Sequence, residues 1–278
     1  MAAKQPIPTF ILSTEGLKPT AYKVYSLSEA VAHEPRGVYT LARTFHGDQA
    51  LLFDAHLDRL EESARLSKID LHLNRAQLRG ALRDLLHQAG YSDTKFRITV
   101  AADDPKCLYL ALEPFQMVPE AIQREGAHVS TLPIVRENPA VKTTDWMITR
   151  KPAQEQLPAG VYEGIMISQE GILLEGLSSN FYAVLDGVLR TTGEGVLAGI
   201  TRKAICTIAP AILPVEMTGI AETDIPHVSE AMLTSSGRGV VPITRINGQP
   251  VGNGAVGPVV SELRRRYDAW TEAHIEAI

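Results

Sequence analysis

The sequence contains very little cysteine. Cys107 and Cys206 are its two cysteines, and they lie far apart, without the close spacing that cysteine-based metal sites show. Small secreted folds that depend on disulfides need more cysteines than this. We therefore expect no disulfide framework, no metal ion and a reducing, cytoplasmic environment.

Long apolar runs and basic clusters are also missing. No apolar stretch approaches the roughly 18 residues that a membrane-spanning helix needs. Residues 1–8 lack a basic region followed by an apolar core, so we expect no signal peptide. The net charge is −5, and the most basic run, residues 264–266, has Glu262 and Asp268 beside it, which is typical of a solvated helix face. Membranes and nucleic acids are therefore not predicted as partners.

The remaining composition is that of an ordinary globular protein. Of the 278 residues, 45% are hydrophobic and 21% are charged, which is enough for one large or two medium domains. Apolar periodicity predicts several helices. One begins with Asp54 as its N-cap, and the next ends with Gly90 as its C-cap. The expected helices cover 54–66, 75–89, 201–209 and 259–270.

Strand-like runs occur in both halves of the chain. The Asp186-Gly187 pair is a strong hairpin signal between two of them. The expected strands cover 37–45, 96–100, 107–112, 128–132, 164–168, 171–175, 180–185, 188–190 and 231–234. Together these patterns predict an α+β (mixed α/β) fold. We expect domains at 1–114 and 126–278, joined by a linker at 115–125, because the stretch 113–126 mixes Pro114 and Pro119 with polar residues.

One glycine motif resembles a nucleotide site without its context. Gly252, Gly254 and Gly257 match the dinucleotide fingerprint G-x-G-x-x-G before a helix. That fingerprint requires a βαβ unit with an acidic residue about 20 positions further on. The chain after Gly257 is too short for this and is predicted to be helical, so a Gly-rich turn is the better interpretation.

Two glycine-bearing turns are candidate anion sites. Gly199 is followed by Ile200 and Thr201 and leads directly into a helix, whose exposed amides and dipole favour a phosphate. The alternative is ordinary helix capping by Thr201. The strand end at Ser235 and Ser236 offers hydroxyls and unhindered amides, and it is either a second anion site or simply a loop.

Two charged residues are candidates of a different kind. Glu175 ends an apolar run, where an ionised carboxylate needs a cation or hydrogen-bond donors nearby, or else faces water. A protonated pyridine nitrogen would be a suitable partner, since a carboxylate keeps such a ring an electron sink. Lys142 precedes a helix start and, on its own surroundings, resembles a surface lysine.

The order and spacing of these segments resemble the class IV aminotransferases, the fold-type IV pyridoxal-phosphate enzymes. This family includes branched-chain aminotransferase, D-amino-acid aminotransferase and 4-amino-4-deoxychorismate lyase. The resemblance covers residues 37–267. It rests on the motifs His-Leu-Asp-Arg-Leu at 56–60, Val-Lys-Thr-Thr-Asp at 141–145, Leu-Glu-Gly-Leu-Ser-Ser-Asn at 174–180, Leu-Ala-Gly-Ile-Thr-Arg at 197–202 and Leu-Thr-Ser-Ser-Gly at 233–237.

The resemblance implies a fold and a role for each candidate residue. The fold would be a small N-terminal α/β domain and a larger C-terminal pseudo-barrel, usually as a homodimer. Lys142 would hold pyridoxal 5'-phosphate as a Schiff base and then move a proton, and Glu175 would meet the pyridine nitrogen. The phosphate would be bound by Arg59, by the Ile200 and Thr201 amides, and by the strand end at Ser235 and Ser236.

The sequence also departs from the family in places that concern the substrate. Ala102 and Asp103 stand where D-amino-acid enzymes and lyases usually carry an arginine and a glycine, and Thr40 replaces a common glutamate. Pro152 falls in a helix that the family keeps, and we expect it to interrupt that helix. Arg43 and Arg97 are candidates for contacts to the substrate carboxylate, with buried structural ion pairs as the alternative.

The resemblance implies an aminotransferase that moves an amino group from an amino acid or amine to a 2-oxo acid. One alternative is a lyase that releases pyruvate from aminodeoxychorismate. Another is a non-catalytic relative that binds the cofactor or nothing.

Overall fold

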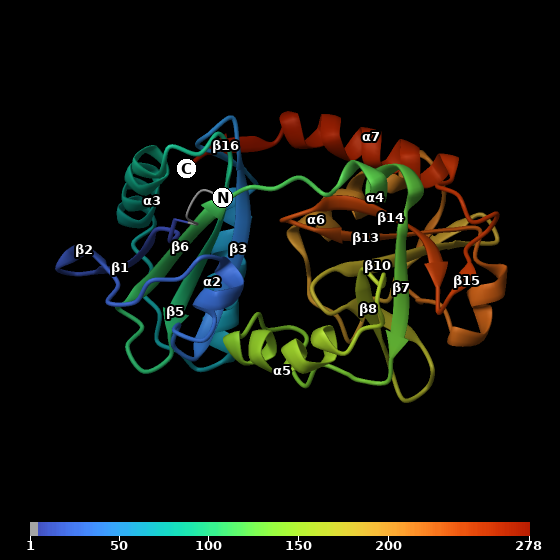
Figure 1. The fold of residues 1–278 in the computed structure, drawn as a ribbon, viewed down its shortest axis with the longest axis horizontal. Coiled ribbons are helices and arrows are strands. Elements are labelled where there is room, and N and C mark those ends of the chain that lie inside the picture. Colours follow the sequence, from blue (N-terminus) through green and yellow to red (C-terminus); the bar gives the residue numbers. More distant parts are fainter. Residues whose placement is uncertain (1–4) are drawn as a thin grey trace. The chain divides into compact units, whose positions relative to one another are not determined.

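The computed structural model describes residues 5–278; residues 1–4, part of the segment searched for a signal peptide, lie outside the described residues. The chain divides into two compact units (Figure 1). Unit 1 contains the chain up to Gln116 together with Val141–Thr149 and His274–Ile278. Unit 2 contains Met117–Ala140 and Arg150–Ala273.

This division differs from the one expected from the sequence. The first boundary falls close to the expected one, but residues 115–125 contain a helix, α4 (Glu120–Glu125). Val141–Thr149 belongs to unit 1 because Tyr39 N donates to Lys142 O at 2.9 Å, beside a bridge between Val38 and Thr143. The C-terminus also belongs to unit 1, because its last strand pairs with residues 49–51.

Unit 1 is built on a seven-stranded antiparallel sheet in the order β16-β4-β3-β5-β6-β1-β2. Two long helices, α2 (Phe53–Leu66) and α3 (Arg75–Ala89), pack on one face of it, and the short α1 (Leu27–Ala30) packs near Ala111. The strands are β1 (Thr9–Ser13), β2 (Gly16–Pro19), β3 (Gly37–Phe45), β4 (Gln49–Leu51), β5 (Thr94–Ala101), β6 (Leu108–Pro114) and β16 (Ile275–Ala277).

The alternation of β3 places its even-numbered residues against α2. Val38 and Ala42 join the same apolar core as Leu57 and Leu60 of α2. Successive strand residues point to opposite faces of a sheet, so Thr40 lies on this buried face as well. A polar side chain is thereby held against the helix that carries Arg59.

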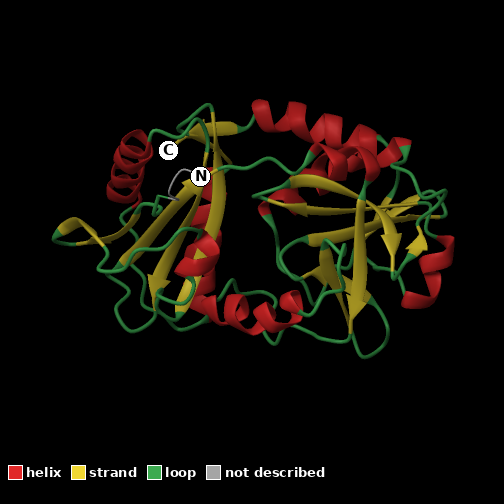
Figure 2. Cartoon of the chain, in the orientation of Figure 1, coloured by secondary structure: helices red, strands yellow, loops and turns green. Residues whose placement is uncertain are grey.

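Unit 2 is built on a nine-stranded sheet (Figure 2) in the order β12-β11-β10-β13-β14-β7-β8-β9, with β15 paired to β14. Because β9 also pairs with β10, six of the strands close into a barrel, and the expected pseudo-barrel in an α+β fold is confirmed. The strands are β7 (Ala127–Leu132), β8 (Glu163–Ile167), β9 (Leu173–Gly176), β10 (Asn180–Leu185), β11 (Val188–Arg190), β12 (Val215–Glu216), β13 (Glu230–Ser235), β14 (Gly239–Ile246) and β15 (Gln249–Pro250).

The remaining helices are α5 (Thr144–Glu155), α6 (Ile200–Ile208) and α7 (Pro258–Glu272), with short 3-10 turns at Ala209–Ala211 and Glu222–His227. Two expectations about helices were wrong. The N-cap of α2 is Leu52, and Asp54 lies inside the first turn. Pro152 lies within α5, which continues to Glu155 instead of ending before the proline.

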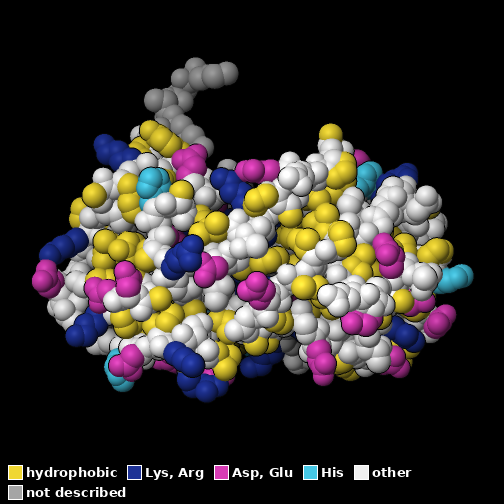
Figure 3. Space-filling model, turned by 90° about the horizontal axis from the view of Figure 1, so that it is seen from below, with side chains coloured by type: hydrophobic (Ala, Val, Ile, Leu, Met, Phe, Trp, Pro, Cys, Tyr) yellow, Lys and Arg dark blue, Asp and Glu magenta, His cyan; other side chains and the backbone are white. Residues whose placement is uncertain are grey.

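Turns and surface charges follow the sequence more closely. Asp186 and Gly187 have φ values of 52° and 75°, the left-handed pair that a tight hairpin turn requires. On the face shown in Figure 3, Lys and Arg side chains are interspersed with Asp and Glu. In the basic run on α7, Arg265 and Arg266 both pair with Glu262. Among the described residues, no helix is long and apolar enough to cross a membrane.

Candidate functional site

Glu175 is a buried carboxylate at the end of β9. Its side chain is 5% exposed, and Oε2 accepts hydrogen bonds from Leu197 N at 3.0 Å and Asn180 Nδ2 at 3.3 Å. Arg136 Nη1 lies 3.6 Å from Oε1. A buried carboxylate is costly unless donors and a cation meet it, and Glu175 has both. Of the two interpretations of this residue, the solvated one is therefore excluded.

Arg136 did not emerge from the sequence as a functional residue. It lies in the irregular segment after β7, where no periodicity marks it, and its side chain is nevertheless 5% exposed. A cation buried this deeply requires an anion as partner. The burial and the pairing with Glu175 are visible only in the folded chain.

Asn180 brings three separate segments of unit 2 together. It lies opposite Glu175 and opposite Thr234 in the sheet, and its Nδ2 also donates to Leu197 O at 2.9 Å. A Cβ on Gly199 would lie 2.2 Å from Asn180 Oδ1, so this position accepts only glycine without rearrangement. Glu175, the turn before α6 and the end of β13 are thus neighbours in unit 2.

The start of α6 is an uncapped helix N-terminus. Its N-cap is Gly199, and no side chain of the described residues caps it. The first amides of a helix lack intrahelical acceptors. Thr201, 1% exposed, lies inside the first turn, and its Oγ1 has no hydrogen-bond partner within residues 5–278. The alternative that Thr201 is the helix cap is excluded.

The start of α7 shows what a satisfied N-terminus looks like in the same unit. Its N-cap is also a glycine, Gly257, but the Glu230 carboxylate accepts from Val259 N at 3.0 Å and from Val260 N at 2.8 Å. The glycine motif that resembles a nucleotide fingerprint therefore leads into a helix start that an internal carboxylate already occupies.

The end of β13 is held by an ion pair between a partly buried arginine and a buried glutamate. Arg238 Nη1 lies 2.7 Å from Glu163 Oε2, and Arg238 Nε donates to Ser235 Oγ at 3.1 Å. Burial opposes ionisation of Glu163, but the Arg238 charge and the Ser178 donors outweigh it and hold the pKa of Glu163 below its usual value. Ser235 thus accepts from Arg238, and Ser236 follows it in the turn, partly buried.

In unit 1, Lys142 has a firmly placed backbone. Its carbonyl accepts from Tyr39 N of β3, and its amide donates to Ser63 Oγ of α2 at 3.3 Å. The Nζ atom lies 4.7 Å from the centre of the Tyr39 ring. Lys142 is only partly exposed. The lysine is therefore fixed by two elements of unit 1.

The same face of α2 carries His56 and Arg59. Thr40 Oγ1 lies 2.9 Å from His56 Nδ1, and Arg59 Nη2 donates to Thr40 Oγ1 at 3.3 Å. Burial, followed by the charges of Arg59 and Lys142, lowers the pKa of His56 well below its usual 6.5. His56 is therefore neutral at pH 7, and it is 1% exposed.

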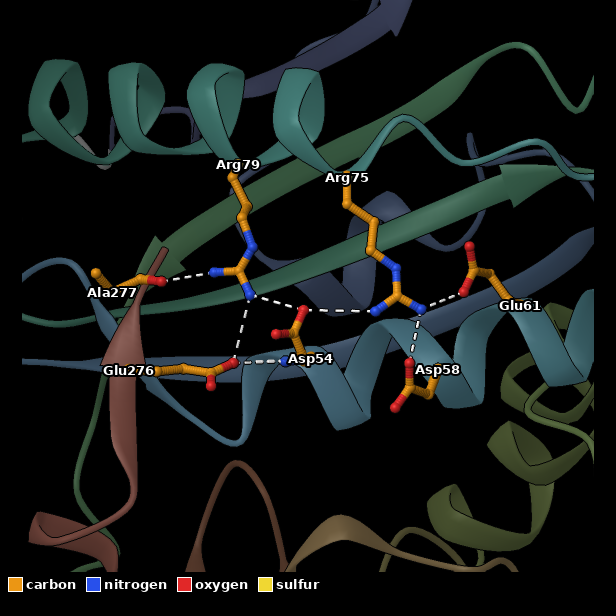
Figure 4. A network of polar contacts seen from close by, with 7 residues as sticks. All are labelled: Asp54, Asp58, Glu61, Arg75, Arg79, Glu276 and Ala277. Atoms are coloured by element: carbon orange, nitrogen blue, oxygen red, sulfur yellow. Dashed lines mark hydrogen bonds and ion pairs between the residues drawn. The ribbon is translucent and has the colours of Figure 1, made fainter.

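The opposite face of α2 is bound to α3 and the C-terminal strand (Figure 4). Arg75 pairs with Asp54, Asp58 and Glu61, and Arg79 pairs with Asp54 and Glu276. Glu276 Oε1 also accepts from Asp54 N at 2.6 Å. These contacts fix the helix from which His56 and Arg59 project.

The two arginines proposed for the substrate have different surroundings. Arg97 is 2% exposed, and its Nε and Nη2 donate to the Glu34 carboxylate at 2.6–3.1 Å. This geometry favours the structural ion pair over a substrate contact. The Arg43 guanidinium carbon lies 4.0 Å from the Phe45 ring centre and 4.2 Å from that of Phe115. Arg43 is thus within cation–π distance of two aromatic rings.

Comparison with known proteins decides the family. The model for "Amino-transferase class IV" matches residues 37–246, which is most of the chain. The chain belongs to the class IV aminotransferases. These enzymes use pyridoxal phosphate, and the chain is accordingly a pyridoxal-phosphate-dependent aminotransferase.

Several relatives match over most of their length. A "Putative branched-chain-amino-acid aminotransferase" of Methanocaldococcus jannaschii is 25% identical, over 83% of this chain and 85% of the relative. A "D-alanine aminotransferase" of Bacillus licheniformis is 28% identical, over 82% and 85%. The two names differ in substrate, so sequence identity alone does not choose between them.

Solved structures share the fold. A branched-chain amino acid aminotransferase of "T.th.", crystallised with pyridoxamine 5'-phosphate, superposes with a TM-score of 0.82 at 21% identity, covering 98% of this chain and 99% of that one. The Escherichia coli enzyme gives 0.77 at 22%, covering 97% and 96%. At these identities the likeness shows the fold-type IV architecture.

The residues of unit 2 fit a phosphorylated pyridine. Among the described residues, the Thr201 hydroxyl and the uncapped amides of α6 lack acceptors, and a phosphate would supply them. The nearby Glu175 carboxylate suits a protonated ring nitrogen. Within residues 5–278, no group of three or more His, Cys, Asp or Glu could hold a metal ion.

Proposed function

We propose that this aminotransferase holds pyridoxal phosphate through Lys142 and moves an amino group from an amino acid to a 2-oxo acid. The observation that carries the proposal is the buried Thr201 hydroxyl, which has no acceptor within residues 5–278. It lies at an uncapped helix start that Asn180 links to the buried Glu175. A helix start left unsatisfied in this way is the expected form of a phosphate site.

In unit 2 the proposed roles follow from charge and hydrogen-bonding capacity. The amides of Ile200 and Thr201, the Thr201 hydroxyl, and the strand end at Ser235 and Ser236 donate to the phosphate. Glu175 keeps the pyridine nitrogen protonated, and Arg136 keeps Glu175 ionised by offsetting its burial. When bound, the cofactor supplies an electron sink that acidifies the C–H bond of the amino acid.

In unit 1 the proposed roles belong to Lys142 and Arg59. Arg59 donates to the phosphate through its guanidinium, which suits oxyanions. Lys142 Nζ, when neutral, would accept a proton from the substrate carbon and would later release it, as a general base and acid. The Tyr39 ring and the two backbone hydrogen bonds at Lys142 fix the starting position of that amine. Arg43 remains a candidate contact for the substrate carboxylate, whereas Arg97 is assigned to structure.

A substrate panel tests the reaction. The purified enzyme is given D- and L-amino acids and aromatic amines with pyruvate or 2-oxoglutarate, and amino-group transfer is followed by chromatography. We expect transfer to at least one 2-oxo acid. Release of pyruvate from aminodeoxychorismate without any transfer would instead assign the lyase reaction, and a protein that stays colourless with pyridoxal phosphate would contradict both.

We also propose that the enzyme is a cytoplasmic homodimer, as the family resemblance implies. Light scattering coupled to size-exclusion chromatography should give twice the mass of the chain. A monomer mass at micromolar concentration would contradict this.

A further inference from the structure

Arg59 does not hold its position alone. Its Nη2 donates to Thr40 Oγ1 at 3.3 Å and lies 3.5 Å from His56 Nδ1. Thr40 and His56 are themselves joined at 2.9 Å. The three side chains form a closed triangle between β3 and α2, in which every edge is within hydrogen-bond distance.

The direction of these hydrogen bonds follows from what each group can do. A guanidinium only donates, so Thr40 Oγ1 accepts from Arg59 and its own O–H is left for His56. His56 Nδ1 then accepts, and the proton of the neutral ring is on Nε2. This is the tautomer that also allows Nδ1 to face Arg59 Nη2.

Thr40 and His56 are too deeply buried to touch a substrate or cofactor. Thr40 is fully buried on the core-facing side of β3, and His56 is buried on α2. Arg59 is only partly buried. The buried pair therefore contacts, through Nη2, an arginine that is itself less buried.

We propose that Thr40 and His56 are positioning residues that orient the Arg59 guanidinium for the phosphate of the cofactor. This rests on the proposed function, because Arg59 acts there as a phosphate contact. The hydroxyl–imidazole pair is uncharged, so these two contacts do not neutralise the positive charge of Arg59. An acidic partner in the same place would neutralise part of it.

The test compares two ligands that differ only in the phosphate. The enzyme is freed of cofactor and titrated with pyridoxal phosphate and with pyridoxal, and binding is followed by absorbance. Thr40→Val should raise the Kd for pyridoxal phosphate about tenfold, which is the scale of one well-oriented hydrogen bond to a charged group. The Kd for pyridoxal should stay unchanged. Thr40→Ser, which keeps the hydroxyl, should restore tight binding.

Thr44→Val is the matched control. Thr44 is buried on the same face of β3 and accepts from Thr94 N at 2.8 Å, so its loss should affect stability similarly. It should leave the ratio of the two Kd values unchanged. His56→Leu removes the acceptor from the other side of the triangle and should repeat the selective loss, which keeps the test decisive where Thr40→Val folds poorly.

The results separate this proposal from the proposed function. Equal weakening of both ligands by Thr40→Val and His56→Leu, or no weakening of either, would overturn the positioning role. A wild-type protein that binds neither ligand would overturn the proposed function and the positioning role together.

Discussion

Arg136 Nη1 lies 3.6 Å from Glu175 Oε1, and both side chains are 5% exposed. Removing one partner of such a pair leaves the other charge buried without its counterion, which is more costly than removing both. The stability of unit 2 therefore depends on the charge of Glu175, which is proposed to contact the pyridine nitrogen.

A double-mutant cycle should measure this coupling. We expect Arg136→Met and Glu175→Gln each to lower the free energy of unfolding by about 3 kcal/mol, and the double variant to lose clearly less than the sum. Urea unfolding provides the measurement. Arg124→Met is the control, because its partner Glu125 is exposed and the loss should stay below about 1 kcal/mol. Strict additivity would show that the two charges do not interact.

Substitution of Thr201 should raise the stability of the cofactor-free protein and weaken its binding of the cofactor. Thr201→Val removes a buried hydroxyl that has no partner within the described residues, so the cofactor-free protein should become more stable, by about 1 kcal/mol. The same change removes a donor from the proposed phosphate site and should weaken binding of pyridoxal phosphate about tenfold. Thermal unfolding and a binding titration measure the two effects.

Thr271→Val is the matched control for Thr201→Val. Thr271 on α7 is also buried, and its Oγ1 likewise has no partner within residues 5–278. The substitution should stabilise the protein without changing cofactor affinity. Equal effects of the two substitutions on affinity would argue against a special role for Thr201.

The lowered pKa of His56 predicts that the stability of the protein depends on pH. Its pKa in the folded chain is well below the unfolded value of 6.5, first because it is buried and then because Arg59 and Lys142 are close. Below pH 6.5 the unfolded chain therefore takes up a proton that the folded chain refuses. The stabilisation is fully present above pH 6.5 and falls with decreasing pH, by about 1.4 kcal/mol per pH unit.

Comparison with His56→Asn isolates this contribution from the other histidines. Urea unfolding of the cofactor-free proteins between pH 7 and 5 should show a steeper loss of stability in the wild type than in the variant. Parallel curves would mean that His56 titrates normally in the folded state.

Local patterns predicted much of the fold. β3 and α3 were placed with their observed bounds, because alternation and a glycine C-cap mark them within a few residues. The assignment of Val141–Thr149 and the C-terminal strand to unit 1 was not predicted. Both depend on pairing between segments about a hundred or more residues apart, and local periodicity contains no information about such pairing.

The candidate site shows the same limit. The order of motifs named Lys142, Arg59 and Glu175, but it did not reveal that Arg136 pairs with Glu175 or that Thr40 joins His56 and Arg59. For Arg97 the sequence left both a substrate contact and a buried ion pair open, because its partner Glu34 comes close only in the folded chain. Motifs identify residue types in order, whereas the contacts among them arise from the fold.

The central claim is that Lys142 carries the cofactor. Reduction of the purified coloured enzyme with borohydride, followed by peptide mapping, locates the lysine that is covalently attached. We expect the pyridoxyl group on the peptide containing Lys142. Lys142→Ala should lose both this label and turnover, whereas Lys151→Ala, a change at an exposed lysine of α5, should keep both. A label on any other lysine of the wild type, or one that persists in Lys142→Ala with turnover intact, would contradict the account.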